Sequence, residues 1–410
     1  MIPDVRTRIP GDRHCSDQLF CGIHLFKNVM LKHVLLLLAT LCTSSTFADK
    51  QGNPTDGRAG RQFEVRINTN VELLGFIYFL GYEGSQSETP SYPEKDRKRY
   101  AYGIDVYQHY KSFAGSKHLA VAIDFAQDIW LDYFINLLIQ LEDFPNAKLT
   151  DQIAPAYYRR FSKSGDLAEA RKNASAFLEA MNGLYREVDF GSYLAKNKSL
   201  YANAIAQVKA GLPEDRFLTE MEEFYQGHFD SYNLVPSLTI PAGMGFGAKY
   251  ESGGKKHAFH VFGTFAIQQW VDSNKLDMGF ADKKHLLELS THEFGHSFVN
   301  PCVDSLPEML IAETQPLFDP IKEAMGPQGY PGWKTCLYEH FVRAGEVVIA
   351  RNLGHSEDAE RIRNHYITNR KFIYLDTLIV ELEKYNATRK GSCRQAITSA
   401  MLRLREVAKR

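Results

Sequence analysis

The sequence lacks any marked excess of one charge. Its 48 lysine and arginine residues balance 49 aspartate and glutamate residues, for a formal net charge of −1. This balance argues against nucleic acid as an obligate partner. Cysteine is also scarce, with six in 410 residues, which excludes a small disulfide-stapled scaffold. With 44% hydrophobic and 24% charged residues, we expect an ordinary globular protein rather than a disordered or fibrous chain.

Long hydrophobic runs are missing as well. The longest run, residues 34–42, is about half the ~20 residues that a membrane-spanning helix requires. A lysine precedes this run and small residues ending at Ala48 follow it, which is the order of a cleavable secretory signal. We therefore expect residues 1–48 to be a signal region, with the true start at Met30 and cleavage after Ala48. The expected location is secreted or periplasmic, with no membrane span in the mature chain.

The character of the remaining sequence changes near residue 230. Residues 49–230 carry long stretches of apolar side chains at helical spacing, which predicts a mainly helical N-terminal region. Segments 234–241 and 257–265 are strand-like, and the glycines between them predict a hairpin. Helical patterns resume at Asp282 and continue to the C-terminus. The expected fold class is α+β, in which residues 231–410 contain a small sheet and then the helices that carry the chemistry.

One pentapeptide carries the clearest chemical signal. Residues 292–296 read His-Glu-Phe-Gly-His, and two histidines four positions apart share one face of a helix. Their imidazole nitrogens can then bind one Zn²⁺ at about 2.0–2.1 Å. Glu293 would lie beside the open position of the metal, where it can take a proton from water. This is the pattern of a metallopeptidase. The bland alternative is a surface helix with two solvated histidines.

The sequence around the motif supplies a helix. Asp282 is a suitable N-cap, and Asn300-Pro301 is expected to end the helix, because the residue before proline is disfavoured in the α region. Gly295 costs about 1 kcal/mol of helix propensity relative to alanine. A second helix that approaches closely at Gly295 would explain this cost.

A catalytic zinc site needs a third protein ligand. Cys302 and Cys336 are two candidates, and the third is a glutamate on the helix expected from Trp333 to about Asn352. On that helix Glu339, Arg343 and Glu346 share one face, so a carboxylate could complete the site while the arginine orients it. The alternative for Glu339 is an exposed ion pair with Arg343, worth only ~0.3–0.5 kcal/mol. The residues alone favour Glu339 over Glu346 only slightly.

The helix pair resembles the gluzincin zinc metallopeptidases, whose third ligand is a glutamate on a second helix. More closely, the chain is similar to an uncharacterised family of secreted bacterial proteins with a domain of unknown function. The residues that carry this resemblance are Asn70-Val-Glu-Leu-Leu74, His292-Glu-Phe-Gly-His-Ser-Phe-Val-Asn-Pro301, Glu339-His-Phe-Val-Arg-Ala344 and Phe372-Ile-Tyr-Leu-Asp-Thr-Leu with Tyr385. The resemblance implies a zincin-like domain over residues 231–410, with zinc held by His292, His296 and Glu339 and with Glu293 as general base.

Three further expectations concern the surroundings of the site. Cys302 and Cys336 bracket the segment between the two helices, which suggests a disulfide in an oxidising compartment. The candidates for stabilising an oxyanion or orienting a ligand are Tyr338, His340, Arg343 and Tyr366. A peptide substrate would add along an exposed strand edge, and the strand at 257–265 is the candidate.

Together these observations predict a secreted zinc-dependent hydrolase that acts as a peptidase on a peptide or protein substrate. Two alternatives stay open. One is a binding or structural protein whose zinc site has lost activity. The other is a hydrolase of non-peptide amides such as cell-wall bonds.

Overall fold

The computed structural model describes residues 62–267, 269–272 and 275–409. The expected signal region, residues 1–48, and its cleavage site lie outside this part of the chain. Among the helices that are described, none is both long and apolar enough to cross a membrane.

The chain from residue 62 to residue 225 is mainly helical, as the sequence predicts. Its elements are β1 (Phe63–Val65), α1 (Thr69–Tyr78), α2 (Gly84–Gln86), α3 (Glu94–Arg99), α4 (Ala101–Tyr110), α5 (Lys117–Ala126), α6 (Leu131–Leu138), α7 (Leu167–Glu187), α8 (Phe190–Lys196), α9 (Lys198–Ala210) and α10 (Arg216–Tyr225). Apolar side chains at helical spacing continue across residues 118–142. The structure nevertheless has two helices there, because Trp130 is extended and separates α5 from α6.

Helix α1 is anchored by buried polar side chains. Asn68 caps its N-terminus by accepting the Val71 amide. Glu72 is fully buried, accepts a hydrogen bond from the Tyr201 hydroxyl at 2.9 Å, and also accepts the Leu238 amide at 3.2 Å. Because Leu238 lies just after the second strand of the sheet, Glu72 ties α1 to the end of that sheet. Burial raises the pKa of Glu72 to about 7, against the effect of these hydrogen bonds.

A small mixed sheet forms the centre of the molecule. Its strands are β2 (Ser231–Pro236), β3 (Gly245–Ser252) and β4 (Lys255–Phe262), together with β1, in the order β1-β2-β4-β3. Strands β1, β2 and β4 are parallel, and β3 runs antiparallel to β4 with Gly247 opposite His260. The strands β5 (Gln269–Asp272) and β6 (Lys275–Asp277) form a separate hairpin.

Two expectations about the sheet are wrong. The strand-like segments near 234–241 and 257–265 are parallel neighbours rather than the two arms of one hairpin, because β3 is the antiparallel partner of β4. Strand β4 therefore lies inside the sheet and is not the exposed edge. The edge strand next to the helix that carries residues 292–296 is β3. Gly245 and Gly247, which suggested a turn, are the start of this strand, whereas Gly243 lies in the turn before it.

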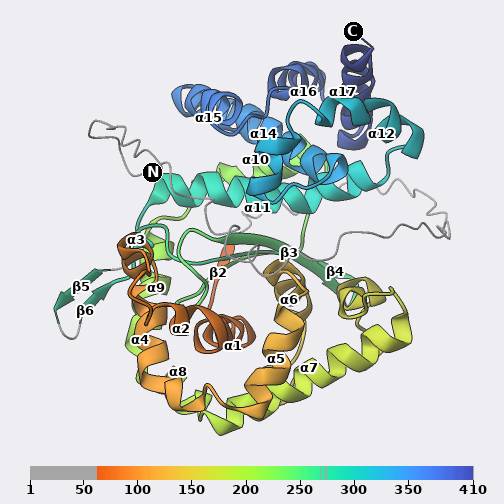
Figure 1. Cartoon of the computed structure of the whole chain (residues 1–410). Helices are drawn as coiled ribbons and strands as arrows, with labels where there is room; N and C mark the ends of the chain where they lie inside the picture. The colour runs from red at the N-terminus through yellow and green to blue at the C-terminus, as the bar shows by residue number, and fades with distance from the viewer. Residues whose placement is uncertain (1–61, 268, 273–274, 410) are drawn as a thin grey trace, which may run out of the picture.

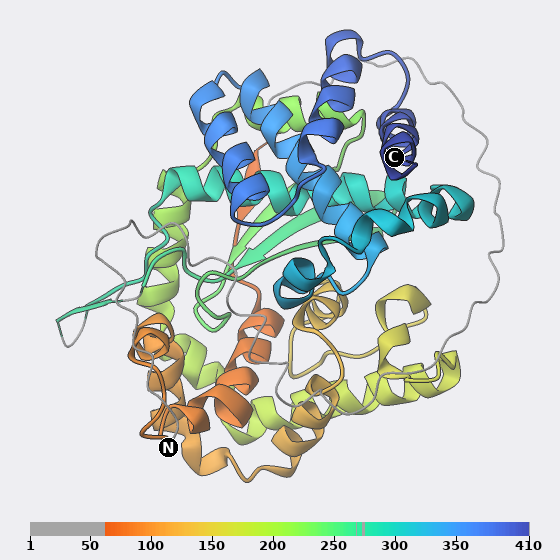
Figure 2. The same cartoon turned by 45° about the horizontal axis from the view of Figure 1, so that its top comes forward.

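The C-terminal part is helical. It contains α11 (Lys283–Asp304), α12 (Glu308–Thr314), α13 (Lys322–Met325), α14 (Trp333–Asn352), α15 (Ser356–Thr368), α16 (Leu375–Thr388) and α17 (Cys393–Ala408). Helix α11 crosses one face of the sheet, and α14 to α17 lie beyond it (Figures 1 and 2). Most helices of the N-terminal part lie on the opposite side of the sheet. This arrangement confirms the expected α+β class.

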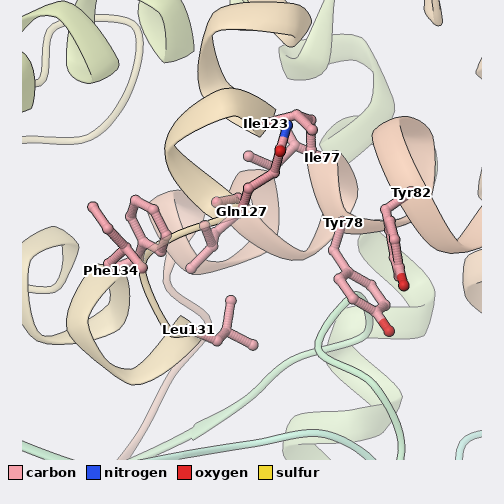
Figure 3. Close-up of a pocket in the computed structure, with 10 residues that line it drawn as sticks. Ile77, Tyr78, Tyr82, Ile123, Gln127, Leu131 and Phe134 are labelled. Carbon is pink, nitrogen blue, oxygen red and sulfur yellow. The ribbon is translucent and has the colours of Figure 1, made fainter. Parts of the chain in front are cut away.

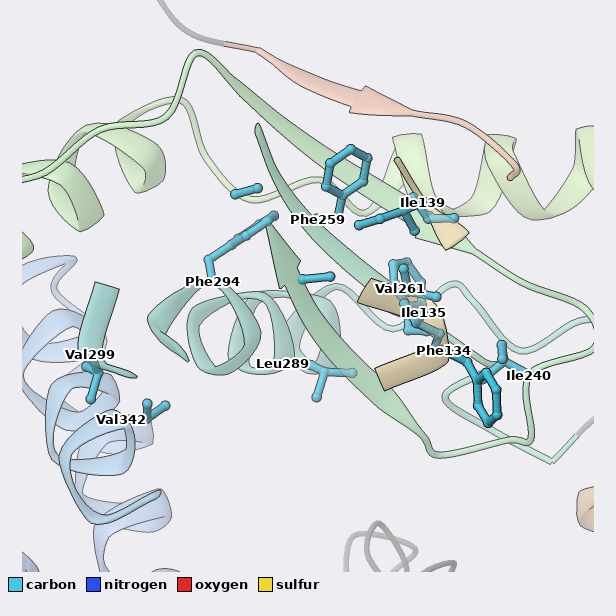
Figure 4. Packing of buried hydrophobic residues seen from close by; sticks show 14 of the residues in the cluster. Phe134, Ile135, Ile139, Ile240, Phe259, Val261, Leu289, Phe294, Val299 and Val342 are labelled. Atoms are coloured by element: carbon cyan, nitrogen blue, oxygen red, sulfur yellow. The ribbon is translucent and has the colours of Figure 1, made fainter. Parts of the chain in front are cut away.

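The β3–β4 hairpin is packed between two helices (Figure 4). Ile135 of α6 and Ile139, which follows α6, lie on one side of it with Phe259, and Leu289 and Phe294 of α11 lie on the other. Period-two alternation along the strands explains this division, since successive side chains point to opposite faces. The face toward α11 is therefore the one that lies next to residues 292–296.

A pocket lies apart from this face, among the N-terminal helices (Figure 3). Its lining is mostly apolar and comes from α1, α5 and the start of α6, with Ile77, Ile123, Leu131 and Phe134 among its residues. No residue of α11 or α14 lines it, so this pocket is separate from the motif residues.

Candidate metal centre

Helix α11 begins where the sequence predicts and ends later. Asp282 caps it by accepting the His285 amide at 2.9 Å. The expected stop at Pro301 is wrong, because the helix continues to Asp304. Pro301 has no amide to donate to the Ser297 carbonyl, but Lys249 of β3 donates to that oxygen at 2.7 Å. Lys249 therefore supplies the hydrogen bond that Pro301 cannot make.

Gly295 lies where α11 and α14 cross. A β-carbon at this position would lie 3.2 Å from Val342 Cγ1 and 3.3 Å from the Tyr225 hydroxyl. At Gly345 of α14 the same hydroxyl would lie 2.4 Å from a β-carbon. The two glycines therefore allow both helices to close around Tyr225, which confirms the close approach that the sequence predicts.

His292, His296 and Glu339 come together at this crossing. The Nε2 atoms of the two histidines are 3.2 Å apart. Glu339 Oε1 lies 3.3 Å from His296 Nε2, and Glu339 Oε2 lies 3.6 Å from His292 Nε2. His292 and Glu339 are buried and His296 is half-buried. The three residues form a group able to hold a metal ion.

The partners of the histidines decide which nitrogen faces the centre. His292 Nδ1 lies 2.5 Å from Glu346 Oε1, and His296 Nδ1 lies 3.1 Å from Asn300 Oδ1. Both oxygens are acceptors, so each Nδ1 carries a hydrogen and each ring turns its Nε2 toward the centre. Burial opposes a charge on His296, but Glu339 raises its pKa to about 9, so without a metal a proton occupies the space between the Nε2 atoms and Glu339, where a cation would replace it.

The spacing also fits a small tetrahedral ion. Ligand bonds of 2.0–2.1 Å in a tetrahedron imply distances of about 3.3 Å between ligand atoms. The two Nε2 atoms are 3.2 Å apart, they lie 3.3 and 3.6 Å from different oxygens of Glu339, and one ligand atom from each residue lies within 4.8 Å of the others. A set of two imidazoles and one carboxylate leaves a fourth position open, as in catalytic zinc sites.

Glu339 is held in its charged form. Arg343 donates to Glu339 Oε2 at 2.9 Å, and Tyr330 donates to the same atom at 3.1 Å. Burial opposes ionisation of Glu339, yet Arg343 and the two histidines keep its pKa well below the usual range. Arg343 is itself buried, with its guanidinium over the rings of Tyr366 and Phe372. The alternative of a solvent-exposed ion pair between Glu339 and Arg343 is therefore wrong, because both side chains are buried.

The motif glutamate lies against β3. Glu293 is buried, and burial raises its pKa, although the two histidines act in the opposite direction. The Gly247 amide donates to its carboxylate. A β-carbon on Gly247 would lie 2.3 Å from the Glu293 carbonyl oxygen, and one on Gly245 would lie 3.1 Å from Oε1. Both glycines are needed for this close approach of strand and helix.

Three of the residues proposed for the oxyanion have other contacts. Tyr338 donates to Asp304 at 2.5 Å, near the end of α11. His340 is fully buried, its Nδ1 is 2.9 Å from the Cys336 carbonyl, and its ring packs against Phe372. Burial lowers the pKa of His340 to about 4. Tyr366 donates to Glu346 Oε2 at 2.5 Å and so supports the partner of His292.

The expected Cys302–Cys336 disulfide is not formed. Both residues are free thiols, as is Cys393. Cys336 is buried in α14, with its sulfur 3.4 Å from His340 Nδ1. Cys302 instead has Cys393 as its hydrogen-bond partner. The two cysteines therefore lie in different surroundings.

Several residues of the site were not assigned from the sequence. Asn300 stands four residues after His296, which is the spacing that allows it to reach the ring on one helix face. Gly245 and Gly247 show a period of two that is typical of one strand face. Tyr330 precedes α14 and carries no local signal of its role. Glu346 was considered as a ligand and is instead the partner of a ligand.

A comparison with protein families shows that residues 146–394, more than half of the chain, match the family described as "Domain of unknown function (DUF4932)". The matched range contains the three candidate ligands and Glu293. No curated protein and no solved structure matches the chain.

Proposed function

The chain belongs to the DUF4932 family, and we propose that it is a secreted zinc-dependent hydrolase that cleaves peptide bonds. The observation that carries this proposal is the convergence of His292 Nε2, His296 Nε2 and a Glu339 oxygen, with Glu293 buried next to them. These are the ligand types and number that a catalytic zinc ion uses. The secretory signal expected at residues 1–48 supports the location.

Bound zinc would supply a Lewis acid that polarises a carbonyl and lowers the pKa of water at the open position to ~7. Glu293 would take the proton from the attacking water and deliver it to the leaving amine. Burial supports this role, because it raises the pKa of Glu293 and makes its carboxylate a better proton acceptor. Glu346 and Asn300 would keep the two rings oriented, and Arg343 would keep Glu339 charged.

The edge position of β3 supports a peptide as the substrate. Among the described strands β3 pairs with β4 alone, its Gly247 amide contacts Glu293, and its Lys249 carbonyl accepts from the Tyr157 hydroxyl. A peptide that adds a strand to an exposed edge gains main-chain hydrogen bonds without needing a particular side chain. Such a peptide along β3 would pass close to Glu293 and the metal ligands.

The test has two measurements on the purified protein. Metal content by mass spectrometry should give about one zinc per chain for the wild type and for Glu293→Gln, and much less for Glu339→Ala. Cleavage of a mixed library of internally quenched peptides should be seen for the wild type only. Glu293→Gln removes the general base but keeps the metal, so it should cleave peptides ~10²–10⁴-fold more slowly than the wild type.

The matched control is Glu308→Gln, since Glu308 is an exposed glutamate in the first turn of α12. It should keep both zinc and cleavage. Zinc without cleavage of any peptide would reject the peptidase, and digestion of purified cell walls would then separate a non-peptide amide hydrolase from a binding protein. Equal zinc in the wild type and Glu339→Ala would reject the three-ligand site.

A further inference from the structure

Cys302 and Cys393 bring the ends of two helices together outside the metal centre. Cys302 lies in the last turn of α11, just after Pro301, and Cys393 is the first residue of α17. Their side chains are hydrogen-bond partners. About 90 residues of chain separate them, so this contact joins segments that are distant in the sequence.

The two thiols are unequal in exposure. Cys302 is half-buried, whereas Cys393 is buried. A solution reagent therefore reaches Cys302 first, and Cys393 is accessible mainly to Cys302. This arrangement of an accessible thiol with a buried partner is suited to a dithiol that closes after attack from outside.

The charges around the pair also differ. The hydrogen bond from Cys393, together with Arg394 and Lys249, lowers the pKa of Cys302 to about 7, although burial acts in the opposite direction. The pKa of Cys393 is raised well above its usual value, first by the Cys302 partner and then by burial. The pair therefore shares one proton near neutral pH, with the thiolate on Cys302, and the thiolate is the reactive form.

We propose that Cys302 and Cys393 form an intramolecular disulfide by exchange with a dialkyl disulfide such as oxidised glutathione or another protein's disulfide. The Cys302 thiolate attacks one sulfur of the oxidant and releases one thiol. The Cys393 sulfur then attacks Cys302 within the mixed disulfide and releases the second thiol. Two cysteine thiols lose two electrons and two protons, and one oxidant disulfide becomes two thiols.

The bond would fasten the end of the metal-site helix. Residues after Pro301 belong to the part of α11 that relies on Lys249 in place of a backbone donor. A link to α17 would hold that part independently of Lys249. Cys336 would stay a free thiol, because it is buried in α14 with His340 as its neighbour.

The test is peptide mapping of the full chain without reduction. The protein is equilibrated with oxidised glutathione, free thiols are alkylated after denaturation, and the digest is analysed by mass spectrometry. The expected result is a peptide containing Cys302 linked to one containing Cys393, with Cys336 alkylated. A Cys302–Cys336 link, or glutathione retained on Cys302 with Cys393 alkylated, would overturn the proposal.

A second measurement compares melting temperatures with and without reduction. Closing a loop of about 90 residues should raise the melting temperature by about 5 °C in the wild type and in the control Cys336→Ser. The rise should be absent in Cys302→Ala and Cys393→Ala. A rise that is lost in Cys336→Ser and kept in Cys393→Ala would contradict the pairing. The mapping of the wild type does not depend on whether any variant folds.

Discussion

Lys249 Nζ donates a hydrogen bond to the Ser297 carbonyl oxygen at 2.7 Å, across the space between β3 and α11. This oxygen is the acceptor that would receive an amide hydrogen from residue 301 if residue 301 were not proline. Burial lowers the pKa of Lys249 to about 8, which means that its ammonium form is less stable here than in water. A single side chain thus links the edge strand to the half of the helix that follows His296.

Replacing Lys249 by methionine should destabilise the protein by about 1–3 kcal/mol, because the Ser297 carbonyl is left without a donor. Pro301→Ala restores a backbone donor to the same oxygen, so the methionine substitution should cost less in that background. Urea unfolding of the four variants of this cycle measures the coupling. An equal cost in both backgrounds would show that Lys249 acts through something other than this hydrogen bond.

Glu346→Gln should weaken zinc binding by about 10–100-fold, because the charged acceptor of the His292 Nδ1 hydrogen is lost while the side-chain shape is kept. Competition with a chromophoric chelator measures the affinity. Tyr338→Phe is the control, since Tyr338 donates to Asp304 rather than to a ligand partner. Unchanged affinity in Glu346→Gln would mean that the ring is held by packing alone.

Gly247→Ala should disturb the contact of β3 with Glu293, because the added carbon would lie 2.3 Å from a backbone oxygen that cannot rotate away. Overpacking of this kind costs about 1–3 kcal/mol, and peptide cleavage should fall as well. Gly326→Ala is the matched control, because nothing lies within 4 Å of its added carbon. Thermal unfolding should place this control within about 0.5 kcal/mol of the wild type. Equal stability of both variants would argue against the tight contact.

Glu72 should make stability depend on pH. Its folded-state pKa of about 7 is above the value of 4.5 expected in the unfolded chain, so the folded state binds its proton more tightly. The resulting stabilisation is fully present below pH 4.5 and is lost as the pH rises through 7. The loss is on the order of 3 kcal/mol. The difference in unfolding free energy between wild type and Glu72→Gln, measured without metal from pH 4.5 to 8, isolates this contribution. A pH-independent difference would contradict it.

The group of His292, His296 and Glu339 was predictable, because its members follow patterns that are visible in the sequence. His292 and His296 share a helix face, and Glu339 belongs to a second helix with a strong apolar pattern and a resemblance to a known family. The sheet was less predictable, because the order β1-β2-β4-β3 depends on contacts between distant segments. The end of α11 could not be predicted either, since the donor that replaces the Pro301 amide lies 48 residues before Ser297 in the sequence.

The two histidines are held in different ways. Asn300, which orients His296, belongs to the same helix, whereas Glu346, which orients His292, belongs to α14 together with Glu339. Helix α14 therefore carries both a candidate ligand, Glu339, and the residue that orients the candidate ligand His292 on α11. A slip or twist of α14 along α11 would misplace Glu339 and release His292 in the same movement, while His296 would keep its orientation. The crossing at Gly295 therefore sets the alignment of all three candidate ligands, although Gly295 itself offers no side chain to a metal.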